Sequence, residues 1–212
     1  MRTTIALTIL LTTATSVVAS RGPSMQPAGD QSVMSYNDGM RYRDRAWAAE
    51  KELAATQDEG KRAKLQQAIR KSYEADIRSQ RSALRDKPDF FQALTELGYA
   101  LRKTGDYATA LEMYDKALTL MPNYAEALEY RGEAYIGLNR VEDARAAYLT
   151  LYDGGDKVRA QALADAMQRW VVARRSDAGG VAPGKIDELA KWLSQRSELA
   201  AQSGSATGGT WH

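Results

Sequence analysis

FQALTELGYALRKTGDYATALEMYDKALTLMPN at residues 91–123 and AEALEYRGEAYIGLNRVEDARAAYLTLYDGGDK at residues 125–157 are two copies of one pattern, offset by 34 residues. In one ungapped register the copies are identical at four structurally demanding positions, which are Leu94 and Leu128, Gly98 and Gly132, Ala110 and Ala144, and Tyr114 and Tyr148. A fixed repeat of roughly 20–50 residues is typical of proteins that stack copies of one small unit. The sequence therefore predicts a stacked array.

Each copy predicts two antiparallel helices joined by a tight turn. The facing apolar stripes are Leu94, Leu97 and Leu101 on the first helix and Ala110, Tyr114 and Ala117 on the second. Gly98 is small where the two helices cross closely. Gly105, with Asn139 in the second copy, tolerates the left-handed backbone that ends a helix. Asp106 is a suitable cap for the helix that follows.

This pattern resembles the tetratricopeptide repeat, with its L-G-Y…A…F…A…P skeleton over 34 residues. The resemblance covers residues 91 to about 158, with departures in the second copy at Arg131, Leu151 and Asp156. It implies an all-α fold, a right-handed α-solenoid of antiparallel helix hairpins. It also implies that the first helices of the hairpins line a concave groove.

Two units, 91–124 and 125–158, bury too little surface on their own, so the flanks are expected to complete the stack. Residues 40–88 predict helices of a degenerate earlier repeat, broken near Asp58-Glu59-Gly60. Residues 159–201 predict a divergent hairpin that caps the array, because Leu163 and Trp170 repeat the first-helix stripe after a slip of one residue. We expect about three and a half hairpins.

The N-terminus has the pattern of a secretory signal peptide over residues 1–19. Arg2 precedes an uncharged, largely apolar run at 5–19, and Val17 and Ala19 are spaced as a signal peptidase requires. An uncleaved membrane anchor is the alternative, but the run is short for a span of about 20 residues. We expect export, to the periplasm of a bacterium, with no membrane span after cleavage. Residues 20–39 and 202–212 are Gly- and Ser-rich and predict a flexible lead-in and a disordered tail.

The residue inventory disfavours an enzyme. The single histidine is His212 and cysteine is absent, so neither a Ser-His-Asp or Cys-His arrangement nor a zinc site is expected. GGVAPGKI at 179–186 resembles a phosphate-binding loop, but Ile186 stands where that loop needs Ser or Thr, and no strand leads into it. DGGD at 153–156 lacks the ligand spacing of a calcium loop. We expect no catalytic residue, cofactor or metal, and the net charge of +2 is too small to indicate a nucleic-acid partner.

A binding surface is therefore the leading hypothesis, with a protein or peptide segment as the partner. The candidate contacts are the residues off the apolar stripe on the first helices: Gln92, Thr95, Tyr99, Arg102, Glu126, Glu129, Glu133, Gln161 and Gln168, with Val171 beside them. The three glutamates predict a partly acidic groove and a partner with Lys or Arg. Analogy with exported proteins of this type suggests an adaptor in secretion, pilus or envelope assembly. The alternative is a homo-oligomer joined through its terminal hairpins, with Trp192 and Val172 exposed.

Overall fold

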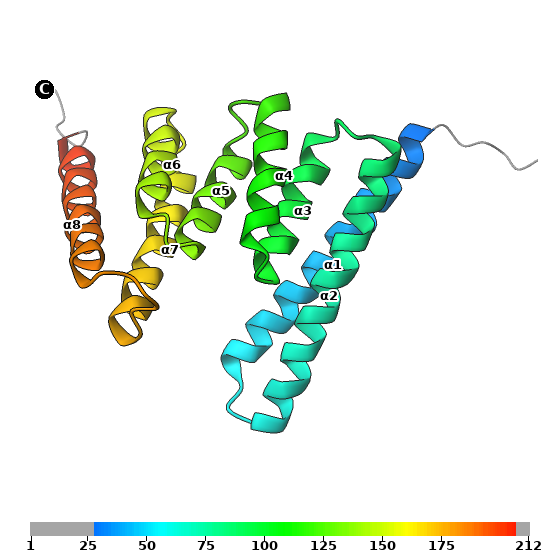
Figure 1. Ribbon diagram of the computed structural model, residues 1–212, viewed down its shortest axis with the longest axis horizontal. Coiled ribbons are helices and arrows are strands. Elements are labelled where there is room, and N and C mark those ends of the chain that lie inside the picture. Colours follow the sequence, from blue (N-terminus) through cyan, green and yellow to red (C-terminus); the bar gives the residue numbers. More distant parts are fainter. Residues whose placement is uncertain (1–27, 207–212) are drawn as a thin grey trace, which may run out of the picture.

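A computed structural model describes residues 28–206, which form eight α-helices with no strand among them. The helices are α1 (Ala28–Ala55), α2 (Glu59–Asp86), α3 (Phe91–Lys103), α4 (Tyr107–Leu120), α5 (Ala125–Gly137), α6 (Val141–Asp153), α7 (Lys157–Ser176) and α8 (Pro183–Ala206). They pair into four successive hairpins that follow one another in a row (Figure 1). The all-α solenoid is confirmed, and the described residues hold four hairpins where about three and a half were predicted.

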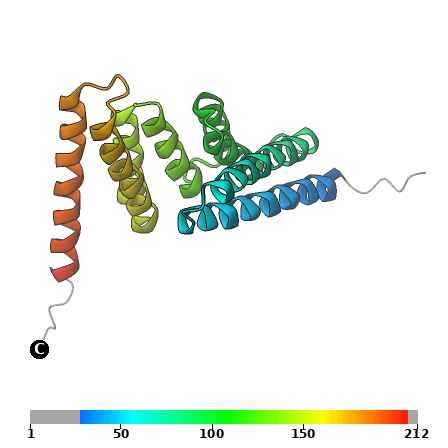
Figure 2. The same cartoon turned by 90° about the horizontal axis from the view of Figure 1, so that it is seen from below.

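The first helices of the hairpins, α1, α3, α5 and α7, contact one another in that order. The second helices join the hairpins, because α2 packs on α3, α4 on α5, and α6 on α7. Figure 2 shows α8 at the far end of the row from α1 and α2. A continuous side formed by first helices is therefore present, as the repeat predicts.

The predicted apolar stripes form the core. Leu94, Leu97 and Leu101 are buried, and Ala110, Tyr114 and Ala117 are fully buried. The two predicted close approaches have identifiable partners. A Cβ at Gly98 would lie 2.6 Å from the Tyr114 ring, and one at Gly132 would meet Leu163 of α7. Glycine therefore spaces the helices both within a hairpin and between hairpins.

Substitution of Gly98 by alanine is expected to lower the free energy of unfolding by about 1–3 kcal/mol, the usual cost of overpacking a core. The added methyl group meets the buried Tyr114 ring, which has no space to move into. Gly184 in α8 is the matched control, because a Cβ there meets nothing. Gly184→Ala should leave stability unchanged or raise it by up to about 1 kcal/mol, the helix propensity difference. Urea unfolding of both variants measures the two changes in the free energy of unfolding. Equal changes would contradict the close approach of Gly98 to the Tyr114 ring.

The turns adopt the backbone predicted for them. Gly105 and Asn139 have φ of 92° and 60°, in the left-handed region where an ordinary side chain is disfavoured. In the first copy, Asp106 N–H then donates to the Leu101 carbonyl at 2.9 Å, which closes the helix end. Asp106 also caps α4, since its carboxylate accepts from Thr109 N–H at 3.2 Å. These local signals were sufficient to place both hairpin turns.

The N-terminal hairpin is longer than the sequence pattern suggested. α1 begins at Ala28, inside the stretch 20–39 predicted to be flexible. Its glycine- and serine-rich start is helical because it packs on α2: Ser32 is fully buried, and a Cβ at Gly39 would meet Gln80 and Asp76. Tertiary packing here overrides weak helix propensity. The predicted signal peptide lies outside the described residues.

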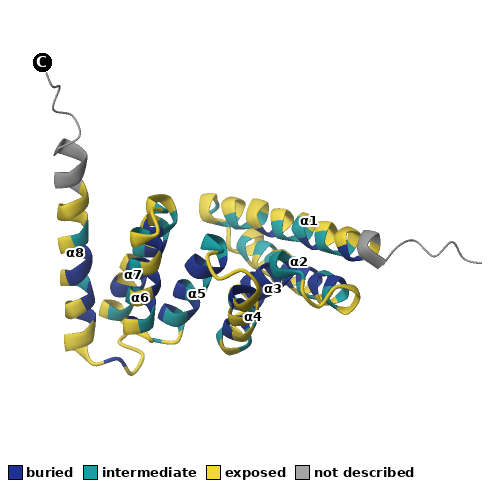
Figure 3. Ribbon diagram, turned by 90° about the horizontal axis from the view of Figure 1, so that it is seen from above, coloured by how far each residue is buried: buried dark blue, intermediate teal, exposed yellow. Residues whose placement is uncertain are grey.

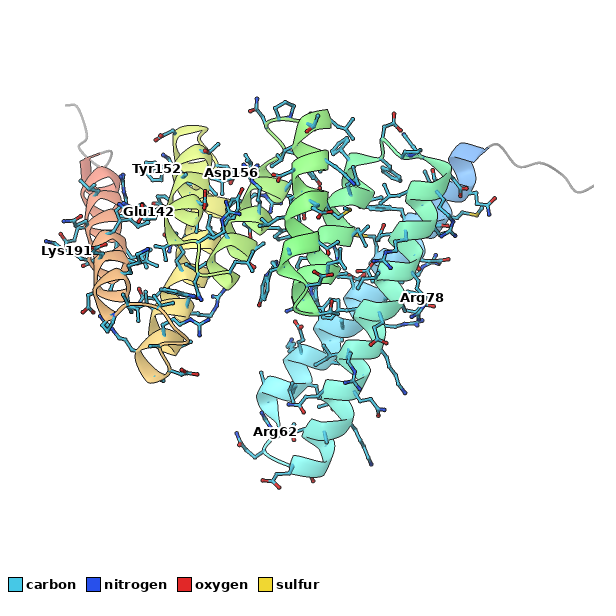
Figure 4. All side chains as sticks on the ribbon, viewed as in Figure 1. Arg62, Arg78, Glu142, Tyr152, Asp156 and Lys191 are labelled. Carbon is cyan, nitrogen blue, oxygen red and sulfur yellow. The ribbon has the colours of Figure 1, made fainter. Side chains whose placement is uncertain are left out.

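The loop between α1 and α2 is held by one arginine. Arg62 Nη1 donates to the carbonyl oxygens of Leu53 and Thr56, at 3.2 and 2.9 Å, and Figure 4 shows this side chain beside the loop. Asp58 caps α2 by accepting from Lys61 N–H at 2.7 Å. The predicted break near Asp58-Glu59-Gly60 is thus a capped turn between two long helices.

The GGVAPGKI stretch joins α7 to α8, with Gly179 and Gly180 at φ of 52° and 80°. Pro183 starts α8, and Asp187 in the second turn of this helix pairs with Arg175 at 3.1 Å. Residues 179–182 are therefore the loop of the last hairpin, and residues 183–186 belong to α8. α8 continues to Ala206, into the predicted disordered tail, and residues 207–212 lie outside the described part of the chain.

Trp192 of α8 is not exposed, contrary to prediction. It is 8% exposed and packs edge-on against Tyr148 of α6, with ring centroids 5.0 Å apart. The buried side of α8 in Figure 3 faces the rest of the array, and its outer side is exposed. Val172 is exposed as predicted, at 59%.

Candidate functional site

A cavity of about 540 Å³ opens on the side formed by the first helices. It is bounded by α1, α3, α5 and α7 and by the start of α4. Its lining residues, here called the groove, are Trp47, Tyr99, Arg102, Lys103, Tyr107, Glu129, Tyr130, Glu133, Ile136, Gly137, Ala166, Arg169 and Trp170. Four of the nine predicted contacts belong to it: Tyr99, Arg102, Glu129 and Glu133.

Aromatic rings form one wall of the groove. Trp47 Nε1 donates to the Tyr99 hydroxyl at 2.5 Å, and this contact joins α1 to α3. The Tyr99 and Tyr130 rings lie 4.9 Å apart between centroids, which extends the wall to α5. Trp47 is 40% exposed, so the wall offers apolar surface to a ligand.

Arg102 lies against this wall and pairs with Glu133. Its guanidinium is 5.1 Å from the Tyr99 ring centroid and 5.5 Å from that of Tyr130. Burial acts to lower the pKa of Arg102, but Glu133 together with Tyr114 and Tyr99 outweighs it, so the pKa is raised. The ion pair joins α3 to α5.

The other predicted carboxylates also have partners within the chain. Glu129 accepts from Arg159 of α7 at 2.6 Å, and burial raises the pKa of Glu129. Glu126 accepts from the hydroxyl groups of Tyr124 and Tyr130, at 2.6 and 3.1 Å, and it does not line the groove. The groove is therefore less acidic than its glutamate content predicts. Arg169 is the one basic lining residue without an ion pair to a described residue.

Two predicted contacts on α3 lie outside the groove lining. Thr95 is fully buried, and its hydroxyl donates to the Phe91 carbonyl at 2.9 Å. Gln92 is half-buried and lies outside the groove lining. Both lie nearer the start of α3, whereas the groove opens beside its C-terminal half.

Gln161 and Gln168 lie in a separate crevice of about 470 Å³ between α7 and α8. The groove contacts on α7 are instead Ala166, Arg169 and Trp170. Two residues along a helix correspond to a rotation of about 200°, so Gln168 faces away from the side that Ala166 occupies. Val171 is fully buried. Gln161 and Gln168 therefore lie on a different side of α7 from the groove.

Sequence reasoning also missed much of the aromatic wall. Tyr130 and Trp170 are spaced among the apolar positions of their helices, and Trp47 lies outside the two clear copies of the repeat. Tyr130 directly follows the predicted contact Glu129, so a wider helical face would have included it. Nothing in the sequence places α1 beside α3.

The described residues hold no cluster of three or more His, Cys, Asp or Glu side chains suited to a metal ion. Asp156 of the DGGD turn accepts from Arg159 N–H at 3.0 Å and caps α7, as expected of a turn (Figure 4). In residues 28–206 no helix has the length and apolar character needed to cross a membrane. His212 lies outside the described residues.

Comparison with known proteins agrees with this architecture. A sequence model of the tetratricopeptide repeat family matches residues 62–124 and 95–159. Among solved structures, the first TPR of Spaghetti (RPAP3) bound to the HSP90 peptide SRMEEVD aligns with a TM-score of 0.50 and 16% identity. The alignment covers 66% of this chain and 94% of that one. No curated protein sequence matches this chain.

Proposed function

We propose that this chain, whose middle part matches tetratricopeptide repeats, is a non-enzymatic interaction module that binds an extended segment of another protein in the groove. The observation that carries the proposal is the groove itself, an open cavity lined by aromatic side chains of successive first helices, of which Trp47 is 40% exposed. The similar structure of Spaghetti has a bound peptide, which supports a peptide as the ligand.

The predicted preference for a basic partner rested on free carboxylates. Because Glu129 and Glu133 are paired with Arg159 and Arg102, a lysine of the partner gains little from them. Arg169, which is exposed and without an ion pair among the described residues, favours an acidic residue instead. We propose a segment that places an apolar or aromatic side chain on the wall and an acidic one near Arg169.

A peptide that binds the protein is first selected from a random library. Its affinity for variants of the protein then tests whether it binds in the groove. Ala166→Trp fills the groove from α7 and is expected to weaken binding of the selected peptide about tenfold or more. The added side chain takes the place of the peptide, so the peptide buries less apolar surface in the groove. Gln168→Trp introduces the same side chain on the opposite side of the same helix and is the matched control. Equal binding to both variants would refute the groove as the site.

The peptide sequences test the charge preference separately. Acidic residues should recur at one position of the selected peptides, and Arg169→Glu should weaken those peptides more than neutral ones. Peptides rich in lysine that bind Arg169→Glu and the unchanged protein alike would favour the basic partner predicted from the glutamates.

We further propose that the protein is exported and acts as an adaptor in the cell envelope, in secretion, pilus or envelope assembly. The apolar run at 5–19 with Val17 and Ala19 supports export. Mass spectrometry of the protein recovered from its own cells is expected to find Ser20 as the first residue. An N-terminus at Met1 would contradict cleavage.

A further inference from the structure

The outer face of α2 carries a stripe of five exposed basic side chains, Lys64, Lys71, Arg78, Arg81 and Arg85, here called the basic face. Four of them recur every seven residues, which is close to two helical turns. These four therefore lie nearly in line along one side of the helix, over about 30 Å at 1.5 Å per residue. Arg81 lies beside the line.

The charge of the basic face is not neutralised within the chain. None of its five side chains forms an ion pair with a described residue, whereas Lys61 of the same helix pairs with Glu52 at 2.7 Å. Among the exposed residues that flank this row, Gln67 is neutral and Glu74 is acidic, so one carboxylate stands among five cations. Like charges held this close repel one another, and a bound anion relieves that repulsion.

The basic face is also accessible. α1 and α2 form the terminal hairpin, and both helices span 28 residues, against 13 for α3. The hairpin therefore extends beyond the rest of the row, as Figure 1 shows. Arg78 points away from the array in Figure 4. Since the groove opens on the side of the first helices, an occupied basic face leaves it free.

We propose that the basic face docks the protein onto an anionic membrane surface. A straight row of charges on an exposed helix lets a planar array of lipid headgroups meet all of them at once, and clustered Lys and Arg near such a surface contribute additively. Nucleic acid is anionic as well, but its phosphates wind around an axis, so a straight row matches only some of them. The basic face also lacks an aromatic side chain on which bases stack. This surface is separate from the proposed peptide groove and does not depend on it.

Cosedimentation of the full chain with vesicles tests the proposal. The probe is vesicles with about a third anionic phospholipid, compared with neutral phosphatidylcholine vesicles at low salt. Lys71→Glu/Arg78→Glu is expected to reduce partitioning onto the anionic vesicles about tenfold or more, because it reverses two of the five charges. Lys185→Glu/Lys191→Glu on the outer side of α8 makes the same change in net charge and should leave partitioning within about twofold.

The apolar run at 5–19 is common to all variants, so the readout is the difference between them on anionic vesicles. Equal partitioning of the α2 variant and the unchanged protein would overturn the proposal. An equal loss in the α8 variant would also overturn it, because net charge rather than the basic face would then be responsible. Tighter binding to a short DNA duplex than to the vesicles, lost in the α2 variant alone, would replace the membrane by nucleic acid.

Discussion

Replacing Leu163 by alanine is expected to lower the free energy of unfolding by about 2–5 kcal/mol, the range for large-to-small substitutions in a core. Leu163 of α7 is fully buried and lies against the backbone of Gly132 in α5. It therefore joins the third of the four hairpins to the fourth, across the boundary where the sequence repeat is lost. Urea or thermal unfolding of the variant measures the loss.

Leu199→Ala is the matched control, because the same substitution falls on a side chain of α8 that is 52% exposed. A change within about 0.5 kcal/mol is expected there, as for most surface positions. Leu163→Ala with an effect as small as that of Leu199→Ala would contradict the stacking of α7 on α5.

Stability is expected to fall as the pH rises from about 5 to about 7, because of two buried carboxyl groups. Asp76 is fully buried between α1 and α2, and burial raises its pKa from 3.8 to about 7. Burial likewise raises the pKa of Glu96 from 4.5 to about 7, although its partner Arg43, at 2.8 Å, opposes the shift. Unfolding at a series of pH values across this window measures the dependence.

The direction follows from the protons that each state binds. Between the ordinary pKa and about 7 the folded chain keeps these protons while the unfolded chain has released them. Stability from these groups is thus fully present below the unfolded pKa and is lost as the pH rises through the folded one. At about 1.36 kcal/mol per pKa unit, the upper limit of the contribution is roughly 4 kcal/mol for Asp76 and roughly 3 kcal/mol for Glu96.

Asp76→Asn isolates one of the two groups. Asp76 Oδ1 accepts from Gln80 at 3.0 Å, an amide oxygen keeps that bond, and the amide nitrogen takes the place of the unpartnered Oδ2. The variant should be more stable than the unchanged protein near pH 8, with a shallower pH dependence. Asp89→Asn replaces an exposed carboxylate and should leave the slope as it was. If stability varied with pH in Asp76→Asn as it does in the unchanged protein, the assignment of part of that pH dependence to Asp76 would be contradicted.

The fold was predictable from the sequence where its determinants are local. Gly98 and Tyr114 meet within one hairpin, and Gly105 and Asp106 act within a few residues of their own positions. Gly132 and Tyr148 repeat the first pair at the same offset, and Asn139 takes the place of Gly105, which identifies the unit. The helical start of α1 was missed because Gly39 and Ser32 are held by α2, a contact that no local pattern records.

The residues that line the groove were predictable from the sequence only on α3 and α5, at its centre. Tyr99 and Glu133 sit on intact repeats, so helical spacing alone puts them on the groove side. On α7 the repeat has diverged, and the predicted contact Gln168 lies two residues from the groove residue Ala166, on another side of the helix. Ion pairs between hairpins, such as Arg159 with Glu129, depend on the stacking of separate units and have no signature in spacing.

The most direct test of the account is to locate a bound segment on the protein. A peptide from the library selection, carrying a photoreactive residue, is crosslinked to the full chain, and the modified residues are identified by mass spectrometry. The account predicts crosslinks to groove residues such as Tyr99, Tyr130 and Trp170. Crosslinks concentrated in the crevice between α7 and α8 or on the basic face of α2, with none in the groove, would contradict it.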